Sequence, residues 1–301
     1  MKAAVITSFG EPSVLQVAEA PRPVPGPGQA LARVRAAGVN PAEIQARAGA
    51  FRLHAPAIIG FEFAGVVEQV GPGVDESLVG ERIAGWPDSA SQGSYAEYTV
   101  SSNFTTIPDG VSFEEAAATV IGADNAARAL GLLNIRPGDT LVVTGASGAL
   151  GSAAVQFARR RGVTVIGVAG TSNADFVQSL GAIPVAHGPG LVDRIRAAAP
   201  GGVDAALDTA GKGPLPALVE VLGGPERIVT LADRDAARYG VAFSAGHSGN
   251  RDSQPVREAL DLIAAGAWTV RIGRSFPLAE AADAHRLVAT GHTHGKVIIL
   301  P

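Results

Sequence analysis

The sequence predicts an α/β protein of two domains, one built on a doubly wound parallel sheet and the other rich in short strands. The first observation is a glycine-rich turn at 145–151, which follows a β-branched run and precedes a helical pattern. The second is the alternation of strand and helix patterns after residue 160, which is typical of repeated βα units. The third is a series of short apolar runs separated by Gly and Pro in the first hundred residues, which predicts a barrel-like β domain.

Composition limits the class of protein. A chain of 301 residues exceeds what one core usually serves, and 47% hydrophobic with 17% charged residues describes a well-packed fold. No apolar run reaches about 18 residues and the opening residues form a strand pattern, so we expect no membrane span, no signal peptide and a cytoplasmic location. A net charge of −4 without a basic tract argues against nucleic acid as a partner. The absence of cysteine excludes disulfides, thiol nucleophiles and cysteine-ligated zinc.

The glycine turn predicts a dinucleotide site. Gly145 permits a sharp turn, Gly148 removes a side chain where a pyrophosphate approaches, and Gly151 lets the helix pack close to the strand. The N–H groups at the start of the helix then face the phosphates. The spacing is one residue longer than the usual G-x-G-x-x-G, and the alternative is a tight turn without a ligand. The flanking strands, 140–144 and 163–168, favour the site, with contacts from Gly145, Ser147, Gly148, Ala149 and Leu150.

The other elements follow in chain order. The β-rich part has strand patterns near 1–10, 30–39, 60–67, 80–85 and 93–100. Ser112 and Glu115 form a capping-box pattern before an alanine-rich helix, where the pattern changes. Beyond the glycine turn we expect strands at 183–185, 205–208, 227–231 and 241–243, and helices at 173–180, 191–198, 215–222 and 251–265. A helix at 278–290 and a strand at 296–300 close the chain.

Six stretches together resemble the medium-chain dehydrogenase/reductase superfamily, and within it the zinc-independent quinone oxidoreductases of the NADPH:quinone reductase and zeta-crystallin type. They span nearly the whole chain in the family's order, at 38–41, 59–67, 93–98, 137–151, 207–211 and 291–297. The resemblance implies a GroES-like catalytic domain from 1–122 and 267–301 and a Rossmann nucleotide-binding domain from 123–266, with the substrate in the cleft. It also implies a homodimer, for which 227–231 or 241–243 would present an edge strand.

The resemblance bears on metal binding. The zinc alcohol dehydrogenases of the superfamily have a cysteine where this chain has Asn40 and a histidine where it has Phe61, and their four-cysteine lobe is absent here. An amide and a phenyl ring cannot replace thiolate and imidazole as ligands. His292 and His294 form the only histidine pair, in a glycine-rich turn, and we interpret them as part of a polar turn. The sequence therefore predicts no metal.

The end of the second strand of the nucleotide domain predicts the cofactor. NAD-specific sites usually have an acidic residue there, which accepts from the ribose hydroxyls. Here the strand continues as Gly170, Thr171, Ser172 and Asn173, with no carboxylate before Asp175. A 2′-phosphate would meet no repulsion and could accept hydrogen bonds from these residues. We therefore expect NADPH, although related reductases often have a lysine at the position of Asn173.

The resemblance also implies residues near the nicotinamide. It places Asn40 there as the catalytic residue and a cofactor contact, the alternative being a cap of the following turn. Asn125 stands where the family has a threonine, and Gln45 and Phe51 replace tyrosines. We interpret Glu62 as a structural turn carboxylate and Lys296 as a solvated charge. Separately, Thr209, Ala232, Phe243 and Ser244 lie at the carboxyl ends of late strands, where an open α/β sheet binds its ligand, and we expect them to contact the cofactor.

The resulting hypothesis is an NADPH-dependent oxidoreductase that transfers hydride to a quinone or an α,β-unsaturated carbonyl without a metal. Catalysis would come mainly from proximity and orientation, with solvent as the proton source. One alternative is an enoyl reductase acting on a carrier-bound acyl chain. The other is a non-catalytic NADPH-binding regulator or crystallin-like protein, which the replacement of the tyrosines keeps open.

Overall fold

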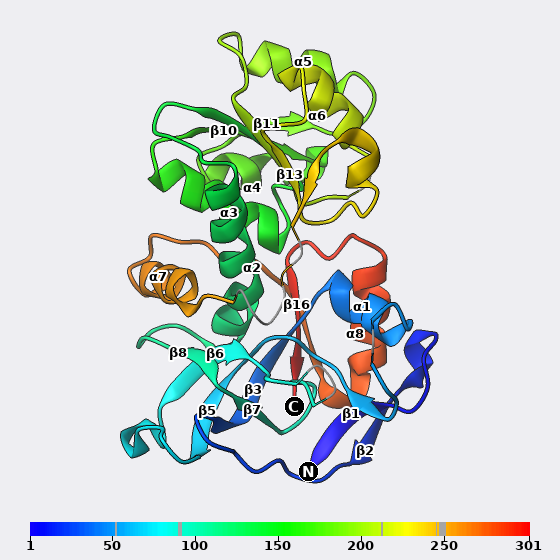
Figure 1. The fold of residues 1–301 in the computed structure, drawn as a ribbon, viewed down its shortest axis with the longest axis vertical. Coiled ribbons are helices and arrows are strands. Elements are labelled where there is room, and N and C mark those ends of the chain that lie inside the picture. The colour runs from blue at the N-terminus through cyan, green and yellow to red at the C-terminus, as the bar shows by residue number, and fades with distance from the viewer. Residues whose placement is uncertain (52, 90–91, 212, 245, 247–250) are drawn as a thin grey trace. The chain divides into compact units, whose positions relative to one another are not determined.

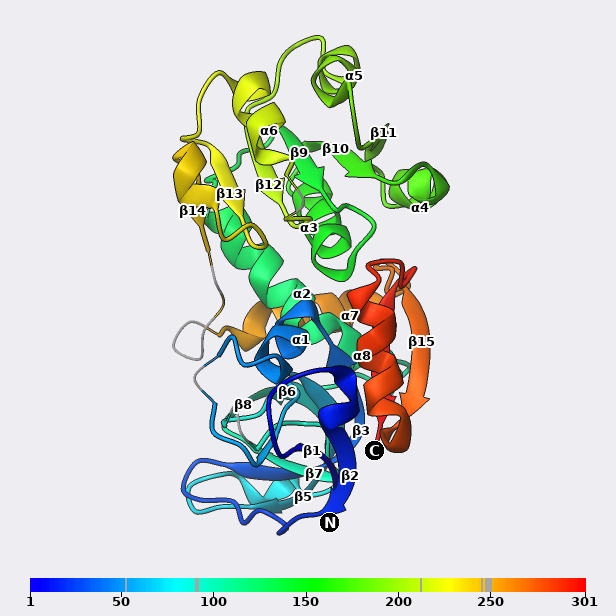
Figure 2. The ribbon, with the colours of Figure 1, turned by 90° about the vertical axis from the view of Figure 1, so that its right-hand side faces the viewer.

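A computed structural model describes residues 1–51, 53–89, 92–211, 213–244, 246 and 251–301 (Figures 1 and 2). The chain forms two compact units, Met1–Val120 with Arg251–Pro301, and Ile121–Asn250. The first is rich in antiparallel strands and the second contains a parallel sheet, so the predicted α/β fold class is confirmed. The described residues contain no helix that combines the length and the apolarity needed to cross a membrane.

The first unit is built on two sheets. Three strands pair in the order β2-β1-β4, and seven more form a second sheet, β15-β16-β3-β5-β6-β8, with β7 also paired to β3. The long strand β3 is central because it pairs with β5, β7 and β16, and nearly all of its residues are buried. The strands are β1 Lys2–Ile6, β2 Leu15–Glu19, β3 Ala30–Val39, β4 Ala57–Ile58, β5 Phe63–Val70, β6 Arg82–Trp86, β7 Tyr98–Ser101, β8 Asn103–Thr106, β15 Ile272–Pro277 and β16 Lys296–Leu300.

Helices flank these sheets. Helix α8 packs on β15 and β16, and Figure 1 shows it running alongside β16. Buried Phe63, Tyr95, Phe276 and Val297 belong to the core between these elements. The helices of this unit are α1 Pro41–Arg47, α7 Ser253–Ala264 and α8 Ala281–Ala289, and α2 Phe113–Leu132 begins here and continues into the second unit. Short 3₁₀ helices occur in both units at Pro12–Val14, Glu76–Leu78, Thr171–Asn173, Ala236–Tyr239 and Leu278–Glu280.

The second unit has a six-stranded sheet of order β11-β10-β9-β12-β13-β14 in which every pair is parallel. Numbered along the chain, this is the 3-2-1-4-5-6 order of the Rossmann fold. The strands are β9 Thr140–Thr144, β10 Thr164–Ala169, β11 Ile183–Ala186, β12 Ala205–Asp208, β13 Ile228–Thr230 and β14 Ala242–Phe243. The helices between them are α3 Ala149–Arg160, α4 Ala174–Ser179, α5 Leu191–Ala198 and α6 Leu215–Leu222.

Two expectations about the units differ from the structure. The expected nucleotide domain at 123–266 includes α7, but residues from Arg251 onward belong to the first unit. There Arg257 Nη1 donates to Thr106 Oγ1 at 2.7 Å and Asn103 Nδ2 to the Arg251 carbonyl at 3.2 Å. Of the two candidate edge strands, β13 lies inside the sheet between β12 and β14, so only β14 of the two lies at an edge.

Candidate functional site

The glycine turn has the geometry that its spacing predicts at two of the three glycines. Gly145 has a φ of +69°, in the left-handed region that favours glycine. A Cβ on Gly151 would lie 2.1 Å from the Gly145 carbonyl oxygen, so the close packing of α3 on the turn requires glycine. Gly148 differs, because its φ of −79° suits any residue and its Cβ would lie 3.3 Å from that oxygen. The turn alone therefore gives only a weak reason for glycine at 148.

The first turn of α3 has the backbone N–H groups that the predicted phosphate site requires. Gly148 is the N-cap of α3, and its own N–H donates to the Gly145 carbonyl at 2.9 Å. The next N–H groups, from Ala149 to Gly151, are those for which a helix has no internal acceptor. Such groups and the helix dipole together favour an anion.

A buried carboxylate that sequence analysis missed organises the carboxyl edge of this sheet. Asp208, at the end of β12, is fully buried and accepts from Thr144 Oγ1 at 2.5 Å and Thr230 Oγ1 at 2.6 Å. It also accepts from the N–H groups of Ala210 at 3.0 Å and Gly211 at 3.1 Å. One side chain thus joins the ends of β9, β12 and β13. An acidic residue at the end of an apolar strand was the available signal.

Three of the four cofactor contacts predicted from the late strands are held at this edge. Thr209 Oγ1 donates to the Thr144 carbonyl at 2.7 Å, and the Ala232 N–H donates to Thr230 Oγ1 at 3.1 Å. The Ser244 N–H donates to the Thr230 carbonyl at 2.9 Å, which places Ser244 directly after β14. These residues therefore lie where an open parallel sheet binds its ligand. The fourth, Phe243, lies on β14 with its side chain 45% exposed.

The predicted ribose-phosphate residues follow β10. Thr171, Ser172 and Asn173 form a 3₁₀ turn in which the first two are exposed. A Cβ on Gly170 would lie 3.8 Å from Asn173 Nδ2 and 3.8 Å from the Nε2 atom of His187. His187, exposed at the end of β11, is therefore a neighbour of this turn that sequence analysis did not include.

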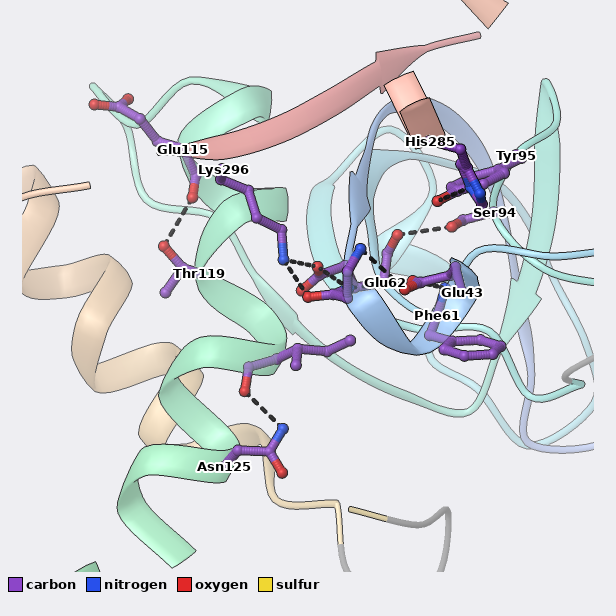
Figure 3. Close-up of polar contacts among 12 residues, drawn as sticks. Glu43, Phe61, Glu62, Ser94, Tyr95, Glu115, Thr119, Asn125, His285 and Lys296 are labelled. Carbon is purple, nitrogen blue, oxygen red and sulfur yellow. Dashed lines mark hydrogen bonds and ion pairs between the residues drawn. The ribbon is translucent and has the colours of Figure 1, made fainter. Parts of the chain in front are cut away.

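In the first unit, Asn40 belongs to a buried polar cluster with Glu43, Glu62 and Lys296, and Figure 3 shows the last three. Its backbone N–H donates to Glu43 Oε2 at 3.0 Å, and its Nδ2 donates to Glu43 Oε1 at 3.1 Å and Glu62 Oε1 at 2.9 Å. Lys296 Nζ donates to Asn40 Oδ1 at 2.6 Å and forms an ion pair with Glu62. We call Asn40, Glu43, Glu62 and Lys296 the Asn40 cluster.

The burial of Lys296 contradicts the expectation of a solvated charge. The side chains of Lys296 and Glu62 are only 3% and 0% exposed. Space for them comes from Gly38 on β3, where a Cβ would lie 2.1 Å from Glu62 Oε1 and 2.8 Å from Lys296 Cε. A glycine at 38 therefore lets an ion pair form inside the unit, and Glu62 is more than a turn carboxylate.

The cluster fixes what Asn40 can offer. Both Nδ2 hydrogens are used by the two carboxylates, and Oδ1 already accepts from Lys296. An amide nitrogen carries two hydrogens, so the Asn40 side chain has no donor left for a ligand. Asn40 is the N-cap of α1 and forms a capping box with Glu43. Its side chain can therefore contact a ligand only as an acceptor.

Asn125 is also engaged. Its Nδ2 donates to the Ile121 carbonyl at 2.9 Å (Figure 3), and its Oδ1 accepts from Arg128 Nη2. Both ends of the Asn125 amide are therefore bonded to other residues of α2.

The residues at the superfamily's metal positions do not suit zinc. Phe61 lies with its ring centroid 5.9 Å from that of Phe51, and Asn40 Oδ1 is already bound to the Lys296 ammonium. Within the described ranges, no three His, Cys, Asp or Glu residues come together in a way that could hold a metal ion. His292 is exposed, with Nδ1 2.8 Å from the Thr290 carbonyl.

Burial, and next the charge of Glu62, raise the pKa of Glu43 to about 7, while Lys296 and the Asn40 hydrogen bond oppose the shift. Glu43 is fully buried, so its ionised form loses hydration. Across the neutral range the carboxyl of Glu43 therefore changes charge inside the cluster.

This shift predicts a pH dependence of stability. The native carboxyl keeps its proton up to about pH 7, whereas the unfolded one loses it near 4.5. Its contribution is therefore fully present below pH 4.5 and is lost as the pH rises through 7, by about 3 kcal/mol at about 1.4 kcal/mol per unit. Urea unfolding from pH 4.5 to 8 should show wild type losing this stability relative to Glu43→Gln. Parallel pH profiles for the two proteins would contradict the assignment.

The comparison with Glu43→Gln is needed because His285 acts in the opposite direction. Burial, and then the charge of Arg47, lower the pKa of His285 to about 3. Stability from His285 is present above pH 6.5 and is lost as the pH falls toward 3. The two groups partly cancel between pH 4.5 and 6.5 in wild type, and the difference between the two proteins isolates Glu43.

Comparison with known proteins agrees with this architecture. Residues 26–116 match the family described as alcohol dehydrogenase GroES-like domain, and residues 180–299 match the family described as zinc-binding dehydrogenase. The sequence is 32% identical to the synaptic vesicle membrane protein VAT-1 homolog of Rattus norvegicus, over 100% of this chain and 84% of that protein. It is 30% identical to the quinone oxidoreductase of Rattus norvegicus, over 100% of this chain and 98% of that protein.

Among solved structures, the mycobacterial protein Rv1454c complexed with NADPH superposes with a TM-score of 0.86 at 29% identity, covering 100% of both chains. Fold and matches together define an oxidoreductase with a GroES-like part and a nucleotide-binding part. The chain belongs to the medium-chain dehydrogenase/reductase superfamily and has quinone oxidoreductases among its relatives. The resemblance read from its motifs is confirmed.

Proposed function

We propose that the protein is an NADPH-dependent reductase that passes hydride to a quinone or an α,β-unsaturated carbonyl. The observation that carries the cofactor choice is the acid-free turn from Gly170 to Asn173 after β10. A carboxylate there would repel a 2′-phosphate, whereas hydroxyl and amide groups can donate to it. The NADPH complex of Rv1454c and the relatives named quinone oxidoreductase support the proposal.

The residues divide into four groups by role. The first turn of α3 binds the pyrophosphate through its N–H groups, and the turn at 171–173 with His187 donates to the 2′-phosphate. The carboxyl edge held by Asp208 supports the nicotinamide half. Any contact that Asn40 makes with the cofactor or the substrate has Oδ1 as the acceptor, because both Nδ2 hydrogens are used. Bound NADPH would supply the hydride, and solvent the proton.

The proposed hydride acceptors explain why activity would need no metal. A conjugated carbonyl or quinone takes hydride without a Lewis acid, and the Asn40 cluster has an ammonium group on the amide oxygen of Asn40. The site should therefore need no metal ion for activity. Retained NADPH binding without turnover on any quinone or enone would instead favour a non-catalytic role.

Cofactor choice provides the direct test. Wild type should prefer NADPH, at the lower end of the roughly tenfold to hundredfold expected for one charge-assisted contact of about 1.5–3 kcal/mol. Thr171→Asp should turn the preference toward NADH by repulsion, and Asn173→Lys should sharpen it for NADPH. The measurement is the ratio of kcat/KM for the two cofactors with one quinone. A wild-type ratio favouring NADH, or no response to Thr171→Asp, would overturn the assignment of this turn.

Native mass spectrometry should report a homodimer without zinc. The edge strand β14 presents Phe243, and an exposed sheet edge favours pairing with a second copy. We expect twice the chain mass of 30.4 kDa and no added metal, with activity unchanged by chelators. A monomer at micromolar concentration would contradict the dimer, and one tightly bound zinc per chain would contradict the metal-free proposal.

A further inference from the structure

Arg128, on α2, contacts Asn125 and Ser244, two residues that were predicted separately as cofactor contacts. Its Nη1 donates to Ser244 Oγ and its Nη2 donates to Asn125 Oδ1. Asn125 is three residues away on the same helix, whereas Ser244 is 116 residues away. One guanidinium group thus joins α2 to the segment that follows β14. Neither the motifs nor the spacing of the sequence singled out this arginine.

A third residue lies against the same pair. A Cβ on Gly246 would lie 2.8 Å from Asn125 Oδ1 and 3.6 Å from Arg128 Nη2, so the backbone passes close to both side chains. We call Asn125, Arg128, Ser244 and Gly246 the Arg128 clamp. All four belong to the second unit.

The geometry of the clamp requires arginine rather than lysine at position 128. Burial lowers the pKa of Arg128, with the charge of Asp124 opposing the shift, but a guanidinium stays charged at neutral pH. Among the residues that the structure describes, Nε of Arg128 is buried without a hydrogen-bond partner, so the group is held through its two terminal nitrogens. A planar fork reaches two acceptors at once, whereas an ammonium group at the end of lysine cannot copy that geometry.

The rest of the edge is already fixed by other contacts. Ser244 is bound to the Thr230 carbonyl through its N–H, and Thr230 is bound to Asp208. The Ser244 hydroxyl accepts from Arg128 Nη1, and this contact sets the position of the hydroxyl. Without the guanidinium, the Ser244 hydroxyl would lose this partner, and the Asn125 amide would keep only the hydrogen bond from its Nδ2 to the Ile121 carbonyl.

We propose that Arg128 is a positioning residue, which orients Asn125 and Ser244 for the nicotinamide half of the cofactor. This rests on the proposed NADPH-dependent function. The clamp lies at the carboxyl edge near β14, at the opposite end of the sheet order from β10 and β11, which carry the proposed 2′-phosphate contacts. Loss of Arg128 should therefore weaken binding of the nicotinamide half and leave the adenine half unaffected.

The test uses two ligands on purified, folded full-length protein. Arg128→Met should raise the Kd of NADPH on the order of tenfold, as expected for loss of charge-assisted positioning, while the Kd of 2′,5′-ADP stays within twofold. Arg128→Lys, which keeps the charge and loses the fork, should recover only part of the affinity. The matched control is Arg196→Met, which removes an exposed arginine paired with Glu220 in the same unit and should change neither Kd.

The outcomes separate the two proposals. If wild type binds neither NADPH nor 2′,5′-ADP, the proposed function fails and the role of Arg128 fails with it. If wild type binds both and Arg128→Met keeps the NADPH affinity, the positioning role is overturned while the function stands. Equal losses for both ligands would also overturn it, because they would indicate a general structural effect.

Discussion

Replacing Lys296 by methionine should lower the free energy of unfolding by about 3–5 kcal/mol, which is the cost of leaving a buried charge without its partner. Glu62 is fully buried and Lys296 is its ion-pair partner, so the variant strands a carboxylate inside the first unit. The same change removes the hydrogen bond from Lys296 Nζ to Asn40 Oδ1, at 2.6 Å. Urea unfolding at pH 6, where Glu43 keeps its proton, measures the effect.

Two further variants identify the cause. Lys296→Met combined with Glu62→Gln removes both charges and should recover most of the lost stability, because a neutral amide needs no counterion. Arg257→Met breaks an exposed pair with Asp261, whose side chains are 46% and 50% exposed, and should cost no more than about 1 kcal/mol. The predicted cost of breaking the buried pair would be wrong if Lys296→Met cost as little stability as Arg257→Met. The stranded charge would not be its cause if the double variant were no more stable than Lys296→Met.

The sequence predicts most of the secondary structure because its signals are local. The β-branched run before the glycine turn is β9, and the pattern at 205–208 is β12 with the same bounds. The repeated βα units predicted a parallel, doubly wound sheet, whereas the order of its strands comes from the structure. The helix pattern at 251–265 was also correct, since α7 covers Ser253–Ala264, but its unit was not. A periodic pattern shows that a helix has an apolar face and does not show which sheet covers it.

The burial and the partners of the charged groups in the Asn40 cluster and the Arg128 clamp were the least predictable features. Lys296 pairs with Glu62, 234 residues earlier in the chain, and the space for both comes from Gly38. Arg128 reaches Ser244 across 116 residues. A single sequence shows such a residue as one charge among many, because only the pairing of distant strands and helices decides whether it is buried. The glycine at 38 was visible within a motif, and its physical reason became clear only from the side chains beside it.

Gly148→Val should weaken NADPH binding by about 1–3 kcal/mol or more, the cost of overpacking a site where the pyrophosphate approaches closely. At about 1.4 kcal/mol per tenfold, this is at least roughly a fivefold rise in Kd. The fold should survive, because the φ of −79° suits valine and its Cβ would meet only the Gly145 carbonyl oxygen, at 3.3 Å. Gly151→Val should instead destabilise the fold itself, since its Cβ would lie 2.1 Å from the same oxygen.

The matched control is Gly201→Val, because Gly201 lies in the same unit and a Cβ there would meet nothing within 4 Å. NADPH affinity is measured by fluorescence titration, and urea unfolding verifies that each variant is folded. Gly201→Val should bind NADPH like wild type, which separates the effect of the site from the effect of adding a β-branched residue to a loop. A folded Gly148→Val protein with wild-type affinity would mean that the pyrophosphate does not approach this glycine, and the assignment of the turn would have to be abandoned.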